Sequence, residues 1–511
     1  MLISVSKNKR KKITISVLAL LFLSMFATLN FMTIPSVEAS SSIVGTSTQP
    51  DPTWLPHQRK SFYANGRFWV FWSDDTNMVY ATSIDGVTWT SKTIIRSCTL
   101  SKYFSIWFDG TYVHYAYFTY DQDVPLYYRR GTPNNDGTIT WSDEQTVLSG
   151  IHGGQLSIAV DSNGYPWIGY RLYSGTTYYP YVTKSFTNDG TWSTASGFPK
   201  QLSLTSSSDW SVGVVPLTSG KMYVIYTYSN NYVHGRLWTG SSWESEETIS
   251  THVVYAGPYF SVVANGDDVH YVYMWYGGAP AKYKGVYRKR TYGSGWGSET
   301  ELFSSSILVV PVLSIDLSTG NLYSFWQSYP SLHHIYYKKC VSGTWDASPV
   351  DWIDETSEQF PAPYSKVTSF YKNYGGYIGV TYTTKTTSPY NVKFAYLSLG
   401  DTTPPTYSNL GVSTTIAGAS CQFHCQWSDN VGLSGYIFGT NNTGTWHNET
   451  WTSLSGNPAW SNVTKTLNST VGVHIAYRFW ANDTNNNWAD TGLTFLTTSS
   501  ESVPLKSTIH G

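Results

Sequence analysis

Four short segments bring together polar and aromatic side chains that could bind a ligand. They read PHQRKSF, IHGGQLS, SSDWSV and THVVYAG. Imidazole, guanidinium, amide and carboxylate groups hydrogen-bond hydroxyls, and aromatic rings stack on sugar faces. The segments therefore predict a surface for a glycan or a protein ligand. The candidate binding residues are His57, Arg59, His152, Gln155, Asp209, Trp210, His252 and Tyr255, with Asp121, Asp123 and Tyr173 in nearby loops.

The sequence shows no pair of carboxylates suited to catalysis. Glycoside hydrolysis needs two facing carboxylates, and the segments expected to form inner strands contain almost no Glu. Asp109, Asp161 and Asp316 directly follow such strands, where we expect them to cap turns at the opposite end. We therefore predict no catalytic residue. If the protein is an enzyme, the class to consider is a glycoside hydrolase.

Two groups of residues raise the hypothesis of a metal site. His114 and His270 occupy matching places in YVHYAY and DVHYVY, but equivalent positions of separate repeats lie far apart, so repeat ancestry explains them better. Cys421 and Cys425 flank His424 in CQFHCQW. On one strand the two cysteines would be about 13 Å apart, too far for a disulfide, and their spacing is not that of a zinc knuckle. We expect two buried thiols.

A tryptophan repeat indicates how these residues are positioned. Its members, about 50 residues apart, are Trp89, Trp141, Trp192, Trp243, Trp296 and Trp345. Within each period four short strand signals recur, separated by Gly, Asn, Asp or Pro. The inner strands are small and apolar, and the outer strands are polar. A fixed period of this kind predicts an all-β propeller with one blade per repeat.

The repeat predicts seven blades, with six as the alternative. Units begin near residues 57, 101, 153, 207, 256, 308 and 362. The seventh has no fourth strand before Asp401, and an unpaired sheet edge is an aggregation hazard. We predict that residues 42–55, which include Trp54, supply this strand by pairing with residues 391–398.

The turn SIDGVTW resembles the Asp-box (BNR-type repeat) of sialidase-like propellers, shortened by one residue. Its members are Ser83, Asp85, Gly86, Thr88 and Trp89, and NDGTITW and NDGTW are degenerate copies. The resemblance implies a sialidase-like fold for residues 55–400, with the Asp-box structural and opposite the binding face. The family's Arg-Ile-Pro motif is missing, and Arg171 is the only Arg expected on an inner strand. Sialidase activity is therefore not expected.

Residues 1–39 are predicted to be a signal peptide, with a membrane anchor as the alternative. A basic KNKRKK run precedes an apolar stretch over residues 13–34, and Val37 and Ala39 stand at the small-residue positions of a cleavage site. Either interpretation exports the rest of the chain and allows membrane contact only through this segment. The propeller follows as residues 40–400.

The DTTPP linker, residues 401–405, precedes a second domain. Residues 406–498 alternate as a β-sandwich does, and WSDNVGLSGYIF and RFWANDTNNNWAD resemble the Ig-like modules of archaeal and bacterial surface proteins. Residues 499–511 are a tail. This domain holds all five N-glycosylation sequons: Asn441, Asn448, Asn462, Asn468 and Asn482.

The turns of the second domain are rich in side-chain oxygen. Asp401, Asp429 and Asp483, with Asn430 and Asn487, could hold Ca²⁺. Ordinary turn chemistry explains the same residues, and no other cofactor is expected.

The composition does not suit a protein that binds nucleic acid, and it favours one that binds an uncharged ligand. Charged residues make up 13% of the chain, aromatic residues 16%, and the net charge is −1. A nucleic-acid binder would carry clustered Lys and Arg. Two hypotheses follow. One is a non-catalytic, extracellular or cell-surface propeller on a glycosylated Ig-like module. The other is a secreted, diverged, sialidase-like hydrolase acting on glycans.

Overall fold

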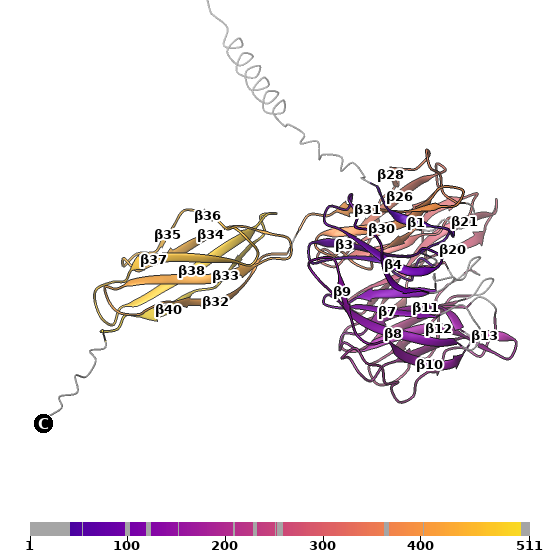
Figure 1. Ribbon diagram of the computed structural model, residues 1–511, viewed down its shortest axis with the longest axis horizontal. Helices are drawn as coiled ribbons and strands as arrows, with labels where there is room; N and C mark the ends of the chain where they lie inside the picture. The colour runs from indigo at the N-terminus through magenta and orange to yellow at the C-terminus, as the bar shows by residue number, and fades with distance from the viewer. Residues whose placement is uncertain are drawn as a thin grey trace, which may run out of the picture. The chain divides into compact units, whose positions relative to one another are not determined.

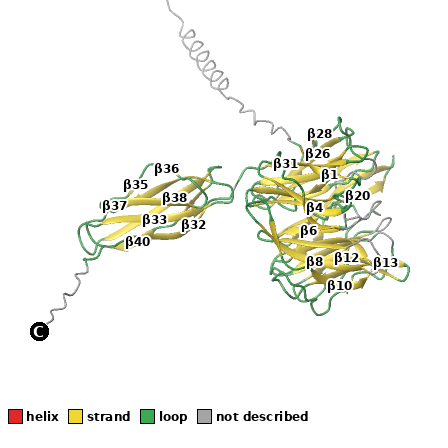
Figure 2. Ribbon diagram, viewed as in Figure 1, coloured by secondary structure: helices red, strands yellow, loops and turns green. Residues whose placement is uncertain are grey.

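The computed structural model describes residues 41–501 apart from 54, 98–102, 119–123, 152, 208–209, 228–231, 251, 253–258, 362–366 and 402. The described chain consists of strands joined by turns and loops, and it contains no helix, so none that could cross a membrane (Figure 2). The predicted signal peptide and Trp54, Asp121, Asp123, His152, Asp209 and Tyr255 lie outside the described residues.

Seven antiparallel sheets contain the described strands between residues 42 and 398. The first sheet contains β2 (Ser61–Ala64), β3 (Arg67–Ser73), β4 (Asn77–Ser83) and β5 (Thr93–Ser97), and the second contains β6 (Phe104–Phe108), β7 (Val113–Phe118), β8 (Val124–Pro133), β9 (Ile139–Trp141) and β10 (Gln145–Ile151). The third contains β11 (Gly153–Val160), β12 (Pro166–Ser174), β13 (Thr177–Lys184) and β14 (Lys200–Gln201); the fourth contains β15 (Ser211–Pro216), β16 (Met222–Thr227), β17 (His234–Trp238) and β18 (Glu247–Thr248); and the fifth contains β19 (Ser261–Asn265), β20 (Asp268–Gly277), β21 (Lys282–Thr291), β22 (Gly295–Trp296) and β23 (Thr300–Ser305). The sixth contains β24 (Val312–Asp316), β25 (Asn321–Gln327), β26 (His334–Val341), β27 (Thr344–Trp345) and β28 (Val350–Asp354), and the last contains β29 (Thr368–Ser369), β30 (Tyr377–Thr384), β31 (Tyr390–Ser398) and β1 (Ser42–Ser47).

The innermost strands contact one another in chain order. β6 contacts β11, and the series continues through β15, β19, β24 and β29. β2 contacts β30 of the last sheet, and the amide of Ile106 in β6 donates to the carbonyl of Arg59 just before β2. The sheets therefore close into a ring, the arrangement of a β-propeller. Figure 1 shows several of these sheets stacked beside one another.

The second strands explain the aromatic content. β7 and β16 are buried along their whole length, because each sheet is covered by a neighbour on both faces. Such strands need large apolar side chains at successive positions and cannot alternate with polar ones. Tyr115, Tyr117 and Tyr226 are among the largest fully buried side chains.

The predicted pairing that closes the ring is present. β1 pairs antiparallel with β31, from Ser42 opposite Phe394 to Ser47 opposite Tyr390. The first described strand of the chain is thus the fourth strand of the last sheet. A β-bulge follows Ile43, and next to it Gly45 lies so close to the Trp72 ring that a side chain there would overlap it.

The periodic tryptophans lie in the connections before the fourth strands. All six are half-buried, and those at 141, 296 and 345 end the extra strands β9, β22 and β27. Five contact an aromatic ring of the neighbouring sheet: Trp89 on Phe394, Trp192 on Tyr128, Trp243 on Trp167, Trp296 on Tyr223, and Trp345 on Tyr287. The repeat therefore marks contacts between sheets.

The Asp-box turn has the geometry that its sequence predicts. Asp85 accepts hydrogen bonds from the amides of Val87 and Thr88 at 2.8 and 2.7 Å, and the Ser83 hydroxyl donates to it at 2.7 Å. Gly86 has φ +73°, a conformation that favours glycine. Trp89 Nε1 donates to Ser42 Oγ at 2.8 Å. The turn thus holds the closing strand β1.

Residues 406–497 form two further antiparallel sheets with a core of their own. One contains β32 (Thr406–Val412), β33 (Ser420–Ser428) and β37 (Ala459–Thr466); the other contains β34 (Leu433–Thr440), β35 (His447–Asn448), β36 (Thr452–Ser453), β38 (His474–Asp483), β39 (Trp488–Asp490) and β40 (Thr494–Thr497). Phe423 of β33 contacts Phe438 of β34 with 5.0 Å between ring centres. We call this unit the C-terminal domain.

Cys421 and Cys425 are free and buried, as expected from their spacing, and both belong to the core of the C-terminal domain. Burial raises the pKa of the Cys425 thiol to about 12. A buried thiol with a raised pKa is a poor nucleophile and a poor metal ligand.

Candidate functional site

Residues 55–60 fill the centre of the ring, and we call them the axial segment. Gln58, Arg59 and Lys60 are at most 5% exposed. Gln58 Nε2 donates to the Leu156 carbonyl of β11 at 2.9 Å, and Lys60 Nζ donates to the Phe104 carbonyl of β6. The segment therefore binds inner strands of separate sheets directly.

Arg59 contacts three more inner strands. Nη2 donates to the Val262 carbonyl at 2.8 Å, and Nη1 to the carbonyls of Leu313 and Ser369 at 3.0 and 3.2 Å. The planar guanidinium presents donors in several directions, which suits a ring of carbonyls. Burial lowers the pKa of Arg59 to about 10, still well above neutrality. Arg59 is thus a buried cation held by backbone dipoles.

The axial segment leaves little space at the centre of the ring. His57 stacks on Phe260 with 4.5 Å between ring centres. The cavity lined by His57, Arg59 and Tyr371 has a volume of about 10 Å³, which is at the lower limit for one water molecule. His57 and Arg59, both predicted to bind ligand, are therefore buried side chains that join the sheets.

Gln155 and Trp210 are also buried. Trp210 is 0% exposed, and its Nε1 donates to the Thr205 carbonyl at 3.2 Å. Gln155 is 6% exposed, and with its amide nitrogen toward the Trp210 carbonyl and Ser211 Oγ, its oxygen accepts from Arg171 Nη1 at 3.1 Å. These side chains connect the third and fourth sheets beneath the surface.

Among the described candidates, His252 reaches solvent, since its side chain is 42% exposed. The imidazole stacks on Trp275, with 3.8 Å between ring centres and planes 6° apart, and Nδ1 lies 2.9 Å from Glu299 Oε2. This side chain offers one edge of a stacked aromatic pair to a ligand.

Two further pairs of aromatic rings, which we call the hairpin tyrosines, lie on hairpins that join the second and third strands of a sheet. We call these hairpins the 2–3 hairpins. Tyr173 and Tyr178 contact each other across the β12–β13 hairpin at 5.0 Å, and Tyr276 and Tyr283 across the β20–β21 hairpin at 4.7 Å. Tyr173 is 37% exposed and Tyr276 46%. Successive strands of each sheet run in opposite directions. The 2–3 hairpins therefore lie at the same end of the ring as the connections from the fourth strand of one sheet to the first strand of the next. The exposed rings therefore share the predicted binding face.

A set of glutamates not singled out from the sequence forms the other recurring polar feature. Each accepts a hydrogen bond from a buried tyrosine and also contacts a cationic or imidazole group: Glu144 with Tyr117 and Arg96, Glu246 with Tyr226 and His234, Glu247 with Tyr223 and Arg290, Glu299 with Tyr273 and His252, and Glu355 with Tyr382 and Lys393. Glu144, Glu246 and Glu299 all stand three residues after a periodic tryptophan, a signal the sequence carried.

Glu144, Glu247 and Glu355 join neighbouring sheets, whereas Glu246 contacts residues of its own sheet. Arg96 of β5 contacts Glu144 of the next sheet at 2.6 Å, and Glu247 of β18 contacts Arg290 of β21 at 2.7 Å. Burial and the neighbouring carboxylate raise the pKa of Tyr117, the opposite of what a nucleophilic phenol requires. We interpret Glu144, Glu247 and Glu355 as clamps between sheets.

The opposite end of the ring holds a hollow of about 520 Å³, lined by the turns between first and second strands. Asp109, Asp161 and Asp316 lie in these turns, and each accepts backbone amide hydrogen bonds within its own turn. They have the turn-capping role predicted for them. His114 contacts Asp109 and Tyr128, and His270 contacts Tyr287, so each histidine has partners in its own sheet.

Among solved structures, the chain is similar to polysaccharide lyase Uly1, with a TM-score of 0.47 and 11% identity over 71% of this chain and 100% of that one. An ulvan lyase of family PL25, bound to -[GlcA(1-4)Rha3S]-, also gives 0.47, with 11% identity over 70% and 97%. A Trypanosoma rangeli sialidase in complex with 2,3-difluorosialic acid gives 0.42, with 10% identity over 91% and 93%. No family model and no curated protein matches the chain. At such identities the likeness concerns the fold and carries no chemistry.

Proposed function

We propose that the propeller is a non-catalytic binding module that recognises an extracellular glycan on the face of the 2–3 hairpins. The observation that carries this proposal is the pair of exposed ring contacts, Tyr173 with Tyr178 and Tyr276 with Tyr283. Exposed aromatic rings on hairpins suit the flat apolar faces of sugars.

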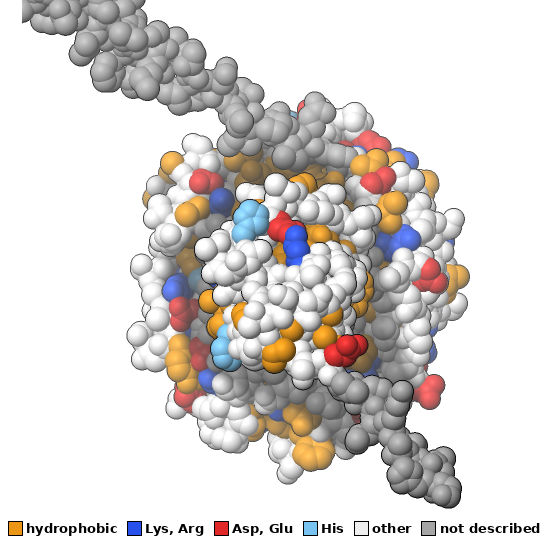
Figure 3. Space-filling view, turned by 90° about the vertical axis from the view of Figure 1, so that its left-hand side faces the viewer, with side chains coloured by type: hydrophobic (Ala, Val, Ile, Leu, Met, Phe, Trp, Pro, Cys, Tyr) orange, Lys and Arg blue, Asp and Glu red, His pale blue; other side chains and the backbone are white. Residues whose placement is uncertain are grey.

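The charge distribution supports a ligand rich in hydroxyls. Lys, Arg, Asp and Glu are 13% of the chain. In Figure 3, which draws the left-hand side of Figure 1, the charged side chains are likewise scattered and gather in no large patch of one sign. Arg171 lies 4.4 Å from the centre of the Tyr178 ring. A cation beside a stacking ring adds a hydrogen-bond donor for sugar oxygens.

The alternative, a diverged sialidase-like hydrolase, needs a Tyr–Glu pair that substrate can reach. The Tyr–Glu pairs among the described residues are made by tyrosines that are at most 1% exposed: Tyr117, Tyr223, Tyr226, Tyr273 and Tyr382. Because these phenols are sealed between sheets, the non-catalytic proposal is the stronger one.

The test is a glycan array probed with the full chain, followed by calorimetry on the best ligand. The double variant Tyr173→Ala, Tyr276→Ala removes one exposed ring from each hairpin. At about 0.5–1.5 kcal/mol a ring, affinity should fall roughly 5- to 150-fold. The matched control is Tyr292→Ala, since Tyr292 is 47% exposed and follows β21 at the opposite end.

Three outcomes would count against the proposal. An equal loss in Tyr292→Ala would move the site off this face. Release of new sugar reducing ends would favour the hydrolase. Binding of a protein with no binding to any glycan would leave adhesion to proteins.

We further propose that the seven sheets are the seven blades of one propeller and that the C-terminal domain is an Ig-like module. The β1–β31 pairing supports the first, and two antiparallel sheets around one core support the second. A crystal structure tests both.

An extracellular or cell-surface location follows as a proposal from the basic and apolar segment before residue 40. N-terminal sequencing of the exported protein tests it: a new terminus after Ala39 supports cleavage, and Met1 supports an anchor.

A further inference from the structure

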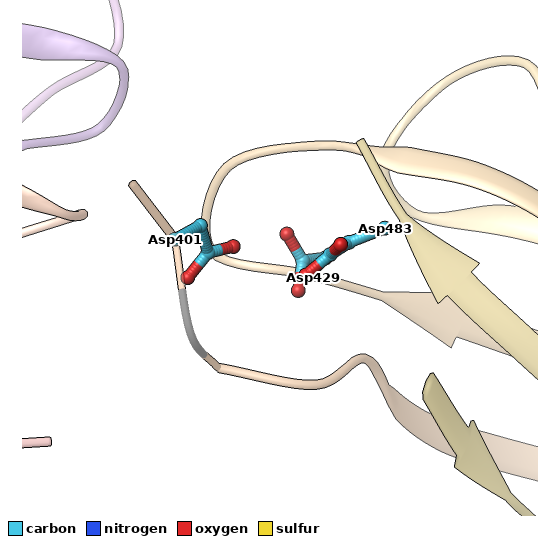
Figure 4. Close-up of side chains that lie close together, drawn as sticks. All are labelled: Asp401, Asp429 and Asp483. Carbon is cyan, nitrogen blue, oxygen red and sulfur yellow. The ribbon is translucent and has the colours of Figure 1, made fainter. Parts of the chain in front are cut away.

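Three aspartates converge where the chain enters the C-terminal domain. Asp401 precedes β32, Asp429 lies between β33 and β34, and Asp483 ends β38. One carboxylate oxygen from each lies within 4.8 Å of the other two. Figure 4 shows the three side chains directed toward one another from three separate segments. Residues distant in sequence thus bring three negative charges together.

Each aspartate uses one oxygen for its own turn. Asp401 Oδ1 accepts from the Thr403 amide at 2.9 Å, Asp429 Oδ1 from the Val431 amide at 2.9 Å, and Asp483 Oδ1 from the Asn485 amide at 2.8 Å. These contacts explain why aspartate suits the turns. They do not explain the second oxygens.

The second oxygens of Asp401 and Asp429 are buried without a hydrogen-bond partner. Asp401 is only 8% exposed, and Asp483 1%. A buried carboxylate oxygen without a donor costs several kcal/mol unless a counter-charge compensates it. No described Lys, Arg or His forms an ion pair with any of the three aspartates. The cluster therefore lacks a positive charge.

The neighbouring side-chain amides donate hydrogen bonds to the cluster but do not neutralise the negative charge of the aspartates. Asn487 Nδ2 donates to the Asp401 carbonyl at 2.8 Å and to Asp483 Oδ2 at 2.7 Å. Asn430 Nδ2 donates to Asp401 Oδ1 at 3.1 Å. These amides connect the three segments by hydrogen bonds but carry no charge. Burial and the charges of Asp401 and Asp483 raise the pKa of Asp429, as expected of carboxylates gathered without a cation.

We propose that Asp401, Asp429 and Asp483 bind one Ca²⁺ ion. Two oxygens bound to the same Ca²⁺ at about 2.3–2.6 Å can be at most about 5 Å apart, and the three carboxylates meet this limit. The donors are all oxygen, whereas structural zinc sites are built from sulfur and nitrogen. Mg²⁺ requires near-ideal octahedral geometry and usually binds one or two carboxylates, so three carboxylates on separate segments suit Ca²⁺ better.

The ion would connect Asp401, where the chain enters the C-terminal domain, to the turns that contain Asp429 and Asp483. The hydrogen bond that Asn487 donates to the Asp401 carbonyl connects two of these segments in the absence of metal. Calcium would convert this weak attachment into a strong one. The exported location proposed above is one in which calcium is plentiful, and sites of extracellular modules bind it at about 10⁻⁴–10⁻³ M.

The test measures calcium binding by the full chain, stripped of metal with a chelator, by calorimetry. The variants Asp429→Asn and Asp483→Asn keep the turn acceptor and remove one charge each. The matched control is Asp136→Asn, whose carboxylate caps an exposed turn in the second sheet of the propeller by accepting from the Thr138 amide at 2.9 Å. We expect one Ca²⁺ per chain, at least tenfold weaker binding in each cluster variant, and unchanged binding in the control.

A second measurement separates metal binding from turn stability. In chelator, Asp429→Asn should melt at the same temperature as the natural chain or higher, because it relieves repulsion among the carboxylates. In calcium it should melt lower, because the natural chain gains binding energy that the variant lacks. The absence of calcium binding by the natural chain up to about 1 mM would overturn the proposal. So would natural affinity in both variants, or an equal fall in melting temperature with and without calcium.

Discussion

Lys60 offers a direct test of the axial segment, because its amino group is buried without a carboxylate partner among the described residues. The side chain is 0% exposed, donates to the Phe104 carbonyl, and lies 3.4 Å from Gln58 Oε1. Burial lowers the pKa of Lys60 well below its ordinary value of 10.5. The folded chain therefore holds this proton less tightly than the unfolded chain does.

This difference sets both the sign and the size of a pH effect. Between the lowered pKa and 10.5, the unfolded chain binds one proton more, so the free energy of unfolding rises with pH. One proton contributes up to about 1.4 kcal/mol per pH unit wherever the folded chain is deprotonated and the unfolded chain is protonated, or up to about 2.7 kcal/mol over two such units below pH 10.5. Below the lowered pKa the slope disappears, because both states are then protonated.

The perturbation is Lys60→Met, which keeps the length of the side chain and removes the charge. Replacing a buried charge by an apolar group of similar size is often neutral or stabilising, so we expect the variant to fold. Urea unfolding followed by tryptophan fluorescence at three pH values gives the free energy of unfolding of each chain. The stability of the natural chain relative to the variant should increase with pH.

The difference between the two chains cancels the groups that titrate in both. The control is Lys282→Met, which removes an exposed lysine at the tip of a 2–3 hairpin and should change the slope little. If the natural chain and Lys60→Met keep a constant difference across this pH range, burial does not lower the pKa of Lys60 and the reasoning fails.

Three further predictions concern other parts of the chain. Burial, with a smaller effect of Lys289, lowers the pKa of His270 from 6.5 to about 4; the folded state then binds fewer protons than the unfolded state, so stability is lost as pH falls from 6.5 toward 4, by about 3 kcal/mol. His270→Gln should flatten the fall in melting temperature over this range, and an unchanged fall would contradict the assignment. Gly45→Ala forces a methyl group into the Trp72 ring and should destabilise the closing strand by about 1–3 kcal/mol, measured by calorimetry; an unaltered melting temperature would show that β1 is dispensable. Expressed in a glycosylating host, Asn448 should carry glycan because it is exposed, whereas Asn482, 7% exposed and bonded to Trp451 and Asn486, should not; peptide mass mapping that finds Asn482 occupied would contradict its burial.

The repeat predicted the strands well because periodic patterns report local structure. Four strand signals per period became four strands in four of the seven sheets and five strands in the other three, and the unpaired edge near residue 398 predicted the pairing with β1. Both inferences depend on hydrogen bonds that every strand must satisfy. No particular side chain had to be placed in space to reach them.

The candidate site was harder to predict because its side chains bond to backbone carbonyls. PHQRKSF contains two cations and suggests a solvated loop. Nothing in the sequence indicates that inner strands converge and direct their carbonyls to the axis, where Arg59 and Lys60 become the donors they need. The tyrosine partners of the glutamates were missed for a similar reason, since strand periodicity does not show which strands face one another.

The axial segment also has a consequence for how the chain folds. Its partners extend from Phe104 to Ser369, and β1 pairs with β31, which ends at Ser398. The strand β1 and the axial segment can therefore complete their contacts only when nearly all of the propeller has been synthesised. Contacts this far apart in sequence make folding slow. Until the ring closes, Arg59 and Lys60 remain hydrated. A chain truncated before the last sheet lacks the β1–β31 pairing and some of the carbonyls that the axial segment binds. The propeller should thus fold as one cooperative unit, after its synthesis is complete.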